Sequence, residues 1–340
     1  MPELSVVIPT FNRAGYCRDL LNILKQSGVP DLEVVVVNDG SSDDTEAVVR
    51  ATDPQAIYIS QRNSGPAAAR NNGFRHSKGC FVAFLDCDDE WQPGKPAQAL
   101  RHLQAHPEID ALFTDAQVGN PRDGFQSLLA SQKPFFELPA KRAVDGFRIL
   151  DPKPFFEWML YRNAIFLGSM IVKREVFEAV GPFDETLCGA ADWNLCLRLA
   201  HRHTFGFWND SLAVYAKHEG GMSNDTDGMC REFCMALKNL RNQSPLDRSE
   251  RRLVDKHLRH HMFGYAYRAY DRGDYREAKT RFAELLKTLP EARAFAYWSF
   301  TNLPGGVARM LRGAKRKADG DSEPLPQPEQ EVLVKAVFGK

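Results

Sequence analysis

Residues 81–89 read FVAFLDCDD, an apolar run followed at once by three acids in four positions. A short apolar run of this kind is typical of a strand buried on both faces. The end of that strand would place carboxylates at the carboxyl edge of a sheet, where open α/β folds bind their ligands. If the strand continues, Asp86 and Asp88 point the same way and could share a hard cation or flank a ribose. The alternative is a solvated acidic turn.

Three more apolar runs precede this one, and each leads into a polar loop and then a helical pattern. We expect strands at residues 5–8, 33–37 and 56–59, and helices at 15–26, at 45–50 and from residue 65 onward. This alternation predicts an α/β fold with a mostly parallel sheet and helices on both of its faces. The loops that follow the four strands would then meet at one edge, at residues 9–13, 38–42, 63–66 and 86–89.

The rest of the chain is less regular. Residues 115–165 suggest loops and short elements, followed by a strand in 164–173, helices at 174–179 and 192–201, and a short strand at 213–216. Basic helices follow, and residues 265–278 resemble one helix–turn–helix unit of a tetratricopeptide repeat. We therefore expect a domain at 1–225, with halves at 1–115 and 116–225, then a helical region at 226–317 and a flexible tail at 318–340.

Composition limits the classes of function. The 340 residues carry 44 Lys+Arg and 44 Asp+Glu, so the net charge gives no argument for a nucleic-acid partner, and none is expected. No apolar run reaches the roughly 18 residues of a membrane span, and no signal peptide is recognised. The seven cysteines form no zinc-type pairs, so reduced thiols and a cytoplasmic location are expected. The basic stretch 307–317 suggests either a peripheral contact with anionic lipid at the inner membrane face or a solvated helix end.

Four motifs in order carry a resemblance: SVVIPTFNR at 5–13, EVVVVNDGSSDDT at 33–45, NSGPAAARNNGFRHSKGCFVAFLDCDD at 63–89 and GPFDETLCGAADWNLCLRLA at 181–200. Together they resemble the family 2 glycosyltransferases of the GT-A fold over about residues 3–220. The resemblance implies metal-dependent, inverting transfer of a sugar from a nucleoside diphosphate sugar, most often a UDP-sugar, to a hydroxyl. The acceptor would be a glycan, a lipid-linked oligosaccharide or a protein.

The resemblance assigns roles within the acidic motif and the third helix. It implies that Asp86 contacts the ribose and that Asp88 binds Mn²⁺ or Mg²⁺, which compensates the charge of the diphosphate. Asp89 would support the site or cap a helix. Arg70 would lie near the nucleotide and diphosphate, unless it is a solvated helix residue.

Other loop residues fit nucleotide binding on chemical grounds. Asp39 can accept the imide N–H of uracil, and the neighbouring Gly40 lets a flat base approach the backbone. A role for Asp39 as a helix cap is the alternative. Thr10 offers a hydroxyl and an N–H at the head of the first helix. The remaining candidates for donor binding in these loops are Pro9, Asn12, Arg13 and Asn63.

Asp192 is the candidate general base. The family carries an Asp at the start of a helix, usually after another acid, and this Asp deprotonates the acceptor hydroxyl as that group attacks the anomeric carbon. Here Ala191 replaces the preceding acid, which puts the tuning of the base and the acceptor class in doubt. The alternative for Asp192 is a plain helix cap.

The resemblance also points to His218, in VYAKHEGGMS, as a second metal ligand or a phosphate contact. Trp91 and Trp193 could stack on sugar faces or belong to the core. Residues 155–158 are a candidate acceptor wall.

Three other functions compete with this one. A sugar nucleotidyltransferase or an NAD-dependent oxidoreductase would need a Gly-rich loop after the first strand, and residues 9–13 contain no glycine. A non-catalytic sugar-nucleotide-binding scaffold remains the alternative from a different class.

Overall fold

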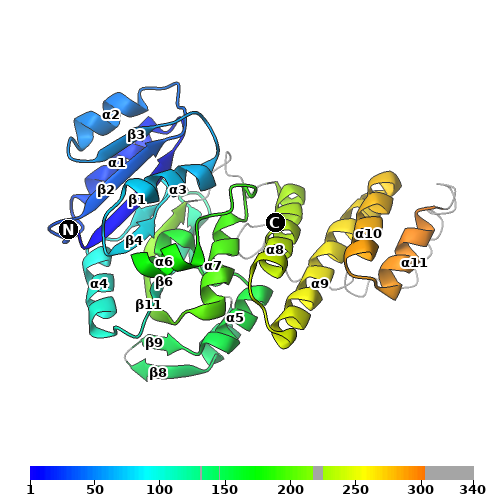
Figure 1. The fold of residues 1–340 in the computed structure, drawn as a ribbon. Helices are drawn as coiled ribbons and strands as arrows, with labels where there is room; N and C mark the ends of the chain where they lie inside the picture. Colours follow the sequence, from blue (N-terminus) through cyan, green and yellow to red (C-terminus); the bar gives the residue numbers. More distant parts are fainter. Residues whose placement is uncertain (131, 145, 217–224, 303–340) are drawn as a thin grey trace. The chain divides into compact units, whose positions relative to one another are not determined.

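The computed structural model describes residues 1–130, 132–144, 146–216 and 225–302. The chain divides into two compact units, Met1–Gly221 and Met222–Lys340. Figure 1 shows a sheet surrounded by helices in the first unit and helices alone in the second. Among the helices described here, none has the length and apolar character needed to cross a bilayer.

The first unit is built on one mixed sheet. Its strands are β1 (Leu4–Thr10), β2 (Glu33–Asn38), β3 (Ile57–Ser60), β4 (Phe81–Phe84), β5 (Glu90–Trp91), β6 (Ala111–Asn120), β7 (Gly124–Ser127), β8 (Ala140–Val144), β9 (Phe147–Leu150), β10 (Ile171–Lys173) and β11 (Phe205–Ala216). The order is β3-β2-β1-β4-β10-β6-β11-β9-β8, with β5 paired to β11 and β7 to β6. The four strands that the sequence predicted are parallel neighbours, so that prediction is confirmed.

The helices of this unit are α1 (Ala14–Leu24), α2 (Thr45–Thr52), α3 (Pro66–His76), α4 (Lys95–Ala105), α5 (Pro152–Tyr161), α6 (Arg174–Val180) and α7 (Ala191–Arg202). A Cβ added to Gly73 of α3 would meet the side chains of Val7 and Val37. Cys17 of α1 instead contacts Thr10. Because alternate residues of a strand point to opposite faces, α1 and α3 cover opposite faces of the sheet.

The middle of the unit departs from the sequence expectation. The strand expected within 164–173 is reduced to the three residues of β10, which pairs antiparallel to both β4 and β6. The piece expected at 213–216 is the end of β11, a strand of twelve residues parallel to β6. The pairing of β11 with β6 shifts its register between Trp208 and Ala213. This shift interrupts the alternation of buried and exposed residues along β11, so the sequence pattern indicated only the last part of the strand.

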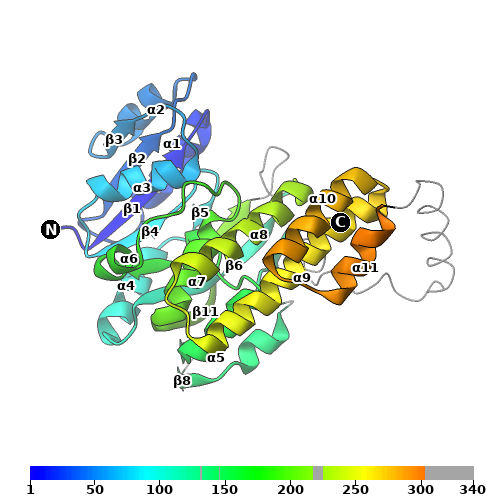
Figure 2. The ribbon, with the colours of Figure 1, turned by 45° about the vertical axis from the view of Figure 1, so that its right-hand side comes forward.

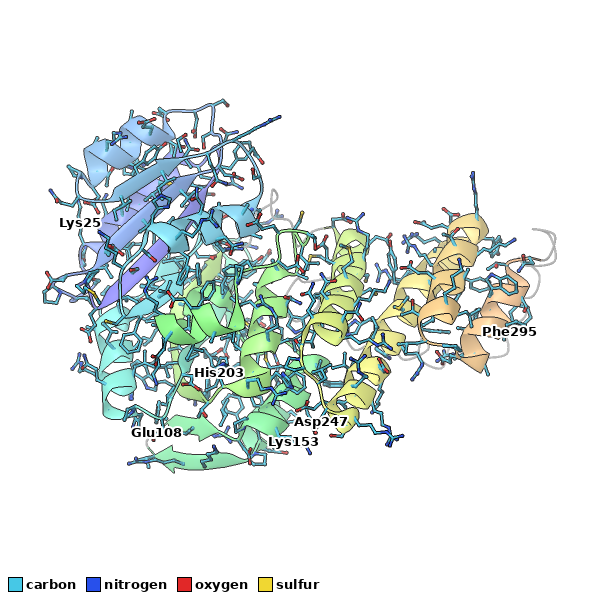
Figure 3. The ribbon with its side chains drawn as sticks, viewed as in Figure 1. Lys25, Glu108, Lys153, His203, Asp247 and Phe295 are labelled. Carbon is cyan, nitrogen blue, oxygen red and sulfur yellow. The ribbon has the colours of Figure 1, made fainter. Side chains whose placement is uncertain are left out.

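The second unit consists of α8 (Thr226–Gln243), α9 (Arg248–Arg272), α10 (Tyr275–Thr288) and α11 (Ala292–Phe300), and consecutive helices pack on one another (Figure 2). Asp247, labelled in Figure 3, starts α9 with a capping box in which Glu250 bonds back to its N–H. Gly273 ends α9 at φ +86°, and Asp274 caps α10 by accepting the N–H of Glu277. The predicted helix–turn–helix is confirmed.

Candidate active site

The four predicted loops meet at one edge because their strands are parallel and adjacent. The N–H of Asp39 donates to the carbonyl of Thr10 over 2.8 Å, and the N–H of Gln61 donates to the carbonyl of Asn38 over 2.9 Å. The Asn12 side chain accepts the N–H of Ser42 at 2.8 Å. The loops after β1, β2 and β3 are therefore tied together.

Asp39 links the loop after β2 to the loop after β3 through hydrogen bonds of its carboxylate. It is 5% exposed, and its Oδ1 accepts from the Gln61 amide at 2.8 Å and from the N–H of Ser64 at 2.9 Å. Its Oδ2 accepts one bond, from the N–H of Gly65 at 2.8 Å, and so keeps capacity for a second donor. The helix-cap alternative is wrong, because α2 starts at Thr45, whose N–H donates to Asp43.

Gly40 is required for the geometry next to Asp39. It adopts φ +84°, and a Cβ at this position would lie 2.9 Å from the backbone nitrogen of Asn63. The backbone thus approaches the third loop more closely than any side chain permits. Asn63 itself is exposed at this edge.

The first loop contributes a buried and an exposed part. Pro9 pairs with Val37 within the sheet, and Thr10 is 3% exposed, with its hydroxyl accepting from the Cys17 thiol at 3.1 Å. Asn12 has φ +53°, and its N–H donates to Ser41. The guanidinium of Arg13 lies over the ring of Tyr16, 5.4 Å from its centre. The Thr10 hydroxyl is therefore directed toward α1, which the sequence did not indicate.

Arg70 is buried, so the alternative of a solvated helix residue is wrong. Its side chain is 6% exposed, and Nη2 bonds to Oδ1 of Asp86 at 2.5 Å. Burial alone would lower the pKa of Arg70, but the charges of Asp86, Asp192 and Asp89 raise it. Its Nε is buried without a hydrogen-bond partner. A buried, incompletely bonded guanidinium is ready to bind an anion.

The acidic motif forms a turn rather than a continued strand. The sheet pairing of β4 ends at Phe84, and the N–H of Asp89 donates to the carbonyl of Asp86 at 3.1 Å. The strand does not continue to Asp86 and Asp88, so the condition for placing them on one strand face is not met, and the carboxylates lie in a turn instead. Asp89 is 3% exposed and caps no helix, because α4 begins only at Lys95.

The carboxylates of the turn repel one another. Burial, followed by the charges of Asp86 and Asp88, raises the pKa of Asp89 well above its ordinary value, against the opposing effect of Arg70. A cation would relieve this repulsion. In the parts of the chain with described coordinates, no three His, Cys, Asp or Glu side chains form a complete metal site.

Asp192 lies inside the first turn of α7, after the N-cap residue Ala190, so it is not a plain helix cap. Burial raises its pKa, Arg70 opposes that shift, and Asp86 adds to it. One carboxylate oxygen accepts the N–H of Trp193 at 2.7 Å. The structure thus brings Asp192 within electrostatic range of the Arg70–Asp86 pair, although more than a hundred residues separate them in the sequence.

An amide clasp links the helices that carry Arg70 and Asp192. Asn71 of α3 donates to the carbonyl of Phe183 at 2.9 Å and to Glu185 at 2.8 Å, and it accepts the N–H of Phe183 at 2.9 Å. The clasp holds the loop before α7 against α3. No sequence pattern indicated this contact, because it joins residues far apart in the chain.

The aromatic candidates belong to the core. Trp91 is 2% exposed and donates to the carbonyl of Gly168 at 2.6 Å, while Trp193 is 4% exposed and donates to that of Met159 at 3.0 Å. The core alternative for both is confirmed. Phe155 is buried against other aromatic rings and Phe156 is equally covered, so these two residues do not form an acceptor wall. His218 lies outside the described residues.

Sequence comparison supplies the family. The model for "Glycosyl transferase family 2" matches residues 5–164. An uncharacterized glycosyltransferase of Rickettsia prowazekii, RP339, is 33% identical over 233 residues, which cover 68% of this chain and 69% of that protein. The chain belongs to glycosyl transferase family 2. It is therefore a glycosyltransferase enzyme, as the four motifs predicted.

Solved structures are similar over most of this glycosyltransferase. Residues 1–349 of S. aureus TarS, in complex with UDP-GlcNAc, superpose with a TM-score of 0.62 at 18% identity, covering 96% of this chain and 95% of that one. The mannosyltransferase PcManGT of Pyrobaculum calidifontis, in complex with GDP-Man and Mn²⁺, gives 0.54 at 20% identity, with 95% and 88% covered. The expected GT-A fold is confirmed.

Proposed function

We propose that this glycosyltransferase moves a sugar from a nucleoside diphosphate sugar, of the UDP class, to a hydroxyl with inversion at the anomeric carbon. The observation that carries the proposal is the Arg70 guanidinium, which is paired with Asp86 and also interacts with Asp192. A group that binds the donor and a candidate base thereby share one site. The acceptor class would be a surface polysaccharide, a lipid-linked glycan or a protein.

Donor binding is assigned to the interlocked loops. Asp39 keeps an acceptor position for the imide N–H of uracil, next to the close backbone approach at Gly40. Asp86 would hold the ribose, and the positive charge of Arg70, which lies beside Asp86, would favour the diphosphate. The supporting residues of this site are Pro9, Thr10, Asn12, Arg13 and Asn63.

The acidic turn is the proposed place for Mn²⁺ or Mg²⁺, with Asp88 as a ligand and His218 as the second ligand that the family resemblance implies. When bound, the cation supplies charge compensation for the departing nucleoside diphosphate. The mutual repulsion that raises the pKa of Asp89 supports a cation at this turn.

Asp192 would take the proton of the acceptor hydroxyl at its carboxylate as the oxygen attacks the sugar opposite the leaving group. Burial raises its pKa and so makes the carboxylate a better base than an exposed aspartate. Attack from that face inverts the configuration in one displacement. Arg70 opposes this effect of burial on the pKa of Asp192 and so favours the ionised carboxylate.

We also propose a domain organisation and a location for this protein. Residues 1–225 would form the catalytic domain of a cytoplasmic protein, and 226–317 a second region whose residues 307–317 would meet the inner face of the membrane. Residues 307–340, which include the tail expected at 318–340, lie outside the described residues. A scaffold that binds a sugar nucleotide without turnover is the alternative, and it predicts donor binding with no product.

Thermal unfolding with a panel of UDP-, GDP- and dTDP-sugars, each with and without Mn²⁺, tests the donor. A ligand at 100 times its Kd stabilises a protein by about 2.7 kcal/mol, which is readily measured. We expect one UDP-sugar to raise the melting temperature only when Mn²⁺ is present. Equal melting temperatures across the panel would refute the proposal, and binding without sugar transfer to any hydroxyl acceptor would favour the scaffold.

A further inference from the structure

The last described helix, α11, has an apolar outer face. The residues of α11 that are exposed to solvent are Ala292, Arg293, Phe295, Ala296 and Phe300, and all except the arginine are apolar. Phe295, which is labelled in Figure 3, is 57% exposed, and Phe300 is 38% exposed. Because residues three and four apart lie on one side of a helix, Ala292, Phe295 and Ala296 form one continuous face.

The packed side of α11 is apolar as well. The ring of Tyr297 is centred 5.5 Å from that of Phe263 in α9 and 5.6 Å from that of Phe282 in α10. Ala294, on the same side, is fully buried. A helix that is apolar on all sides is normally covered on all sides, by protein or by lipid. The outer face of α11 is therefore expected to have a partner.

The neighbouring helix α10 presents a different surface to solvent. Its exposed residues are all polar, namely Arg276, Lys279, Thr280, Glu284 and Lys287. Among the described residues of the second unit, the exposed large apolar side chains are those of Phe295 and Phe300, and both belong to α11. The apolar surface is thus confined to a single helix of this unit.

The charge of the chain around α11 indicates the kind of partner. No Asp or Glu occurs between Ala292 and Ala318, whereas six Lys or Arg do. Five of these six belong to the basic stretch 307–317, which lies outside the described residues. A second copy of α11 would cover the apolar face but would bring six more positive charges beside the first six. An anionic lipid surface suits both properties, because acyl chains cover apolar side chains and lipid phosphates attract the bases.

We propose that α11 and the basic residues that follow it form a docking surface for an anionic membrane. Phe295 and Phe300 enter the boundary between headgroups and acyl chains, and the bases of 307–317 contact lipid phosphates. With nine residues, α11 is far shorter than the roughly 20 residues needed to cross a bilayer, so it lies along the surface. The inference rests on the membrane contact proposed above for 307–317 and adds its apolar part, which the sequence did not indicate.

Flotation of the full chain with lipid vesicles tests this surface without donor or acceptor. Vesicles of phosphatidylcholine alone are compared with vesicles made of equal parts of phosphatidylcholine and phosphatidylglycerol. We expect the protein to float with the anionic vesicles only, and to bind them less well as salt is added, because salt screens the attraction between bases and phosphates. Equal recovery with both kinds of vesicle, or no recovery with either, would overturn the proposal.

Two double variants separate the apolar contribution from the basic one. Phe295→Ser combined with Phe300→Ser should lower the apparent affinity for anionic vesicles about tenfold or more, because two aromatic rings no longer enter the lipid. Arg312→Glu combined with Lys315→Glu should lower it by a similar factor, because two attractive charges become repulsive. Wild-type affinity in the first of these variants would refute the role of α11 and leave only the basic contact of 307–317.

Each double variant has a matched control. Phe125→Ser combined with Phe136→Ser removes two Phe side chains of the first unit that are 42% and 38% exposed. Arg276→Glu combined with Lys279→Glu reverses two exposed bases of α10. We expect both controls to bind anionic vesicles within about threefold of wild type, since neither pair belongs to the proposed surface. A control that loses as much affinity as its partner variant would show that the effect is not specific to this surface.

Tryptophan fluorescence distinguishes insertion from adsorption through the bases alone. The ring of Trp298 is centred 5.9 Å from that of Phe295, and the other four Trp residues of the chain precede the second unit. Anionic vesicles with brominated acyl chains should quench part of the wild-type fluorescence, and Trp298→Phe should remove that part. Vesicle binding without any quenching in wild type would contradict insertion of α11.

Other occupants of the face predict other results. If residues 332–338 of the same chain or a second copy cover α11, the protein binds no vesicles, and the Phe295→Ser, Phe300→Ser variant changes its melting temperature or its mass in light scattering instead. Either result refutes this inference. Vesicle binding by a protein that binds no nucleotide would instead refute the proposed sugar transfer and leave the docking surface in place.

Discussion

Two buried arginines, one in each unit, have opposite surroundings. The side chains of Arg70 and Arg281 are each 6% exposed. Arg281 donates to Asp227 and Glu277 at 2.5 Å and to the carbonyl of Tyr265 at 2.8 Å. Arg70 has one carboxylate partner, Asp86, and a buried Nε with none. Arg70 thus bonds to a single carboxylate, whereas Arg281 bonds to two carboxylates and a carbonyl of its own unit.

The neighbouring carboxylates show the same contrast. Hydrogen bonds from Arg281 and Arg272, acting against burial, lower the pKa of Asp227 to about 2. Burial and like charges instead raise the pKa of Asp89, and burial raises that of Asp192. Charges matched within the fold indicate a structural cluster, while charges left in excess are typical of functional sites.

The largest expected effect is on catalysis. Replacing Asp192 by Asn should lower kcat by about 10²- to 10⁴-fold, because the base is lost while the shape of the side chain is kept. UDP binding, measured by calorimetry, should not change. Asp44→Asn is the control, since Asp44 is an exposed residue whose side chain caps no N–H of α2. Full activity in the Asp192 variant would contradict the assignment.

The second effect is a difference in stability between variants at the two arginines. Arg281→Met should lower the free energy of unfolding by about 3 kcal/mol, because Asp227 loses its buried partner and keeps the exposed Arg272. Arg70→Met should cost less, since it removes a hydrogen bond to one carboxylate, whereas Arg281 bonds to two carboxylates and to a carbonyl. Urea unfolding of both variants measures this difference. Equal losses would remove the distinction between the two clusters.

Arg70→Met also has an expected functional result. It should abolish UDP binding, while Arg281→Met, assayed under conditions where it is folded, should retain it. Retention of UDP binding by the Arg70 variant would place the diphosphate elsewhere.

A smaller effect concerns the backbone at Gly40, in the loop after β2, which is part of the proposed donor site. Gly40→Ala and Gly65→Ala both place a side chain at positive φ, +84° and +88°, which costs about 1–3 kcal/mol. An added Cβ at Gly65 meets no atom within 4 Å, whereas at Gly40 it meets Asn63 at 2.9 Å. We expect Gly40→Ala to lose more stability and more UDP affinity than its control. Equal losses would show that the close approach is unimportant.

The smallest effect is the pH dependence of the free energy of unfolding that arises from Asp227 and its arginine partners. Because the pKa of Asp227 is lowered from 3.8 to about 2, its contribution is complete above pH 4 and is lost as the pH falls toward 2. The loss is at most about 2 kcal/mol and is reduced by solvent screening, since the side chain is one-third exposed. Urea unfolding at decreasing pH should show a shallower acid slope for Asp227→Asn than for wild type. An unchanged slope would contradict this origin.

Much of the fold could be predicted because its signals are local. The apolar runs of β1, β2 and β4 and the polar residues that end them are consecutive in the sequence, and parallel pairing then gathers their loops. A strand was predicted within 164–173, but the sequence did not indicate that it has only three residues or that it runs antiparallel to β4 and β6. The interrupted β11 was underestimated for a related reason, since its register shift breaks the period of two.

The site shows the same limit. The sequence identified Asp39, Arg70 and Asp192 as candidates, but not what holds them. Gln61 binds the carboxylate of Asp39, and Asn71 clasps Phe183, through contacts that no local pattern encodes. The carbonyl groups that accept the indole N–H of Trp91 and of Trp193 likewise lie far along the chain.

The clasp made by Asn71 has a kinetic consequence. Asn71 bonds to both the N–H and the carbonyl of Phe183. These bonds hold α3, which carries Arg70, against the loop that leads to Asp192. Displacement of either part by an arriving molecule is then transmitted to the other. If Arg70 binds the donor and Asp192 is the base, as proposed above, we expect donor binding and reactivity toward the acceptor to change together when Asn71 is replaced.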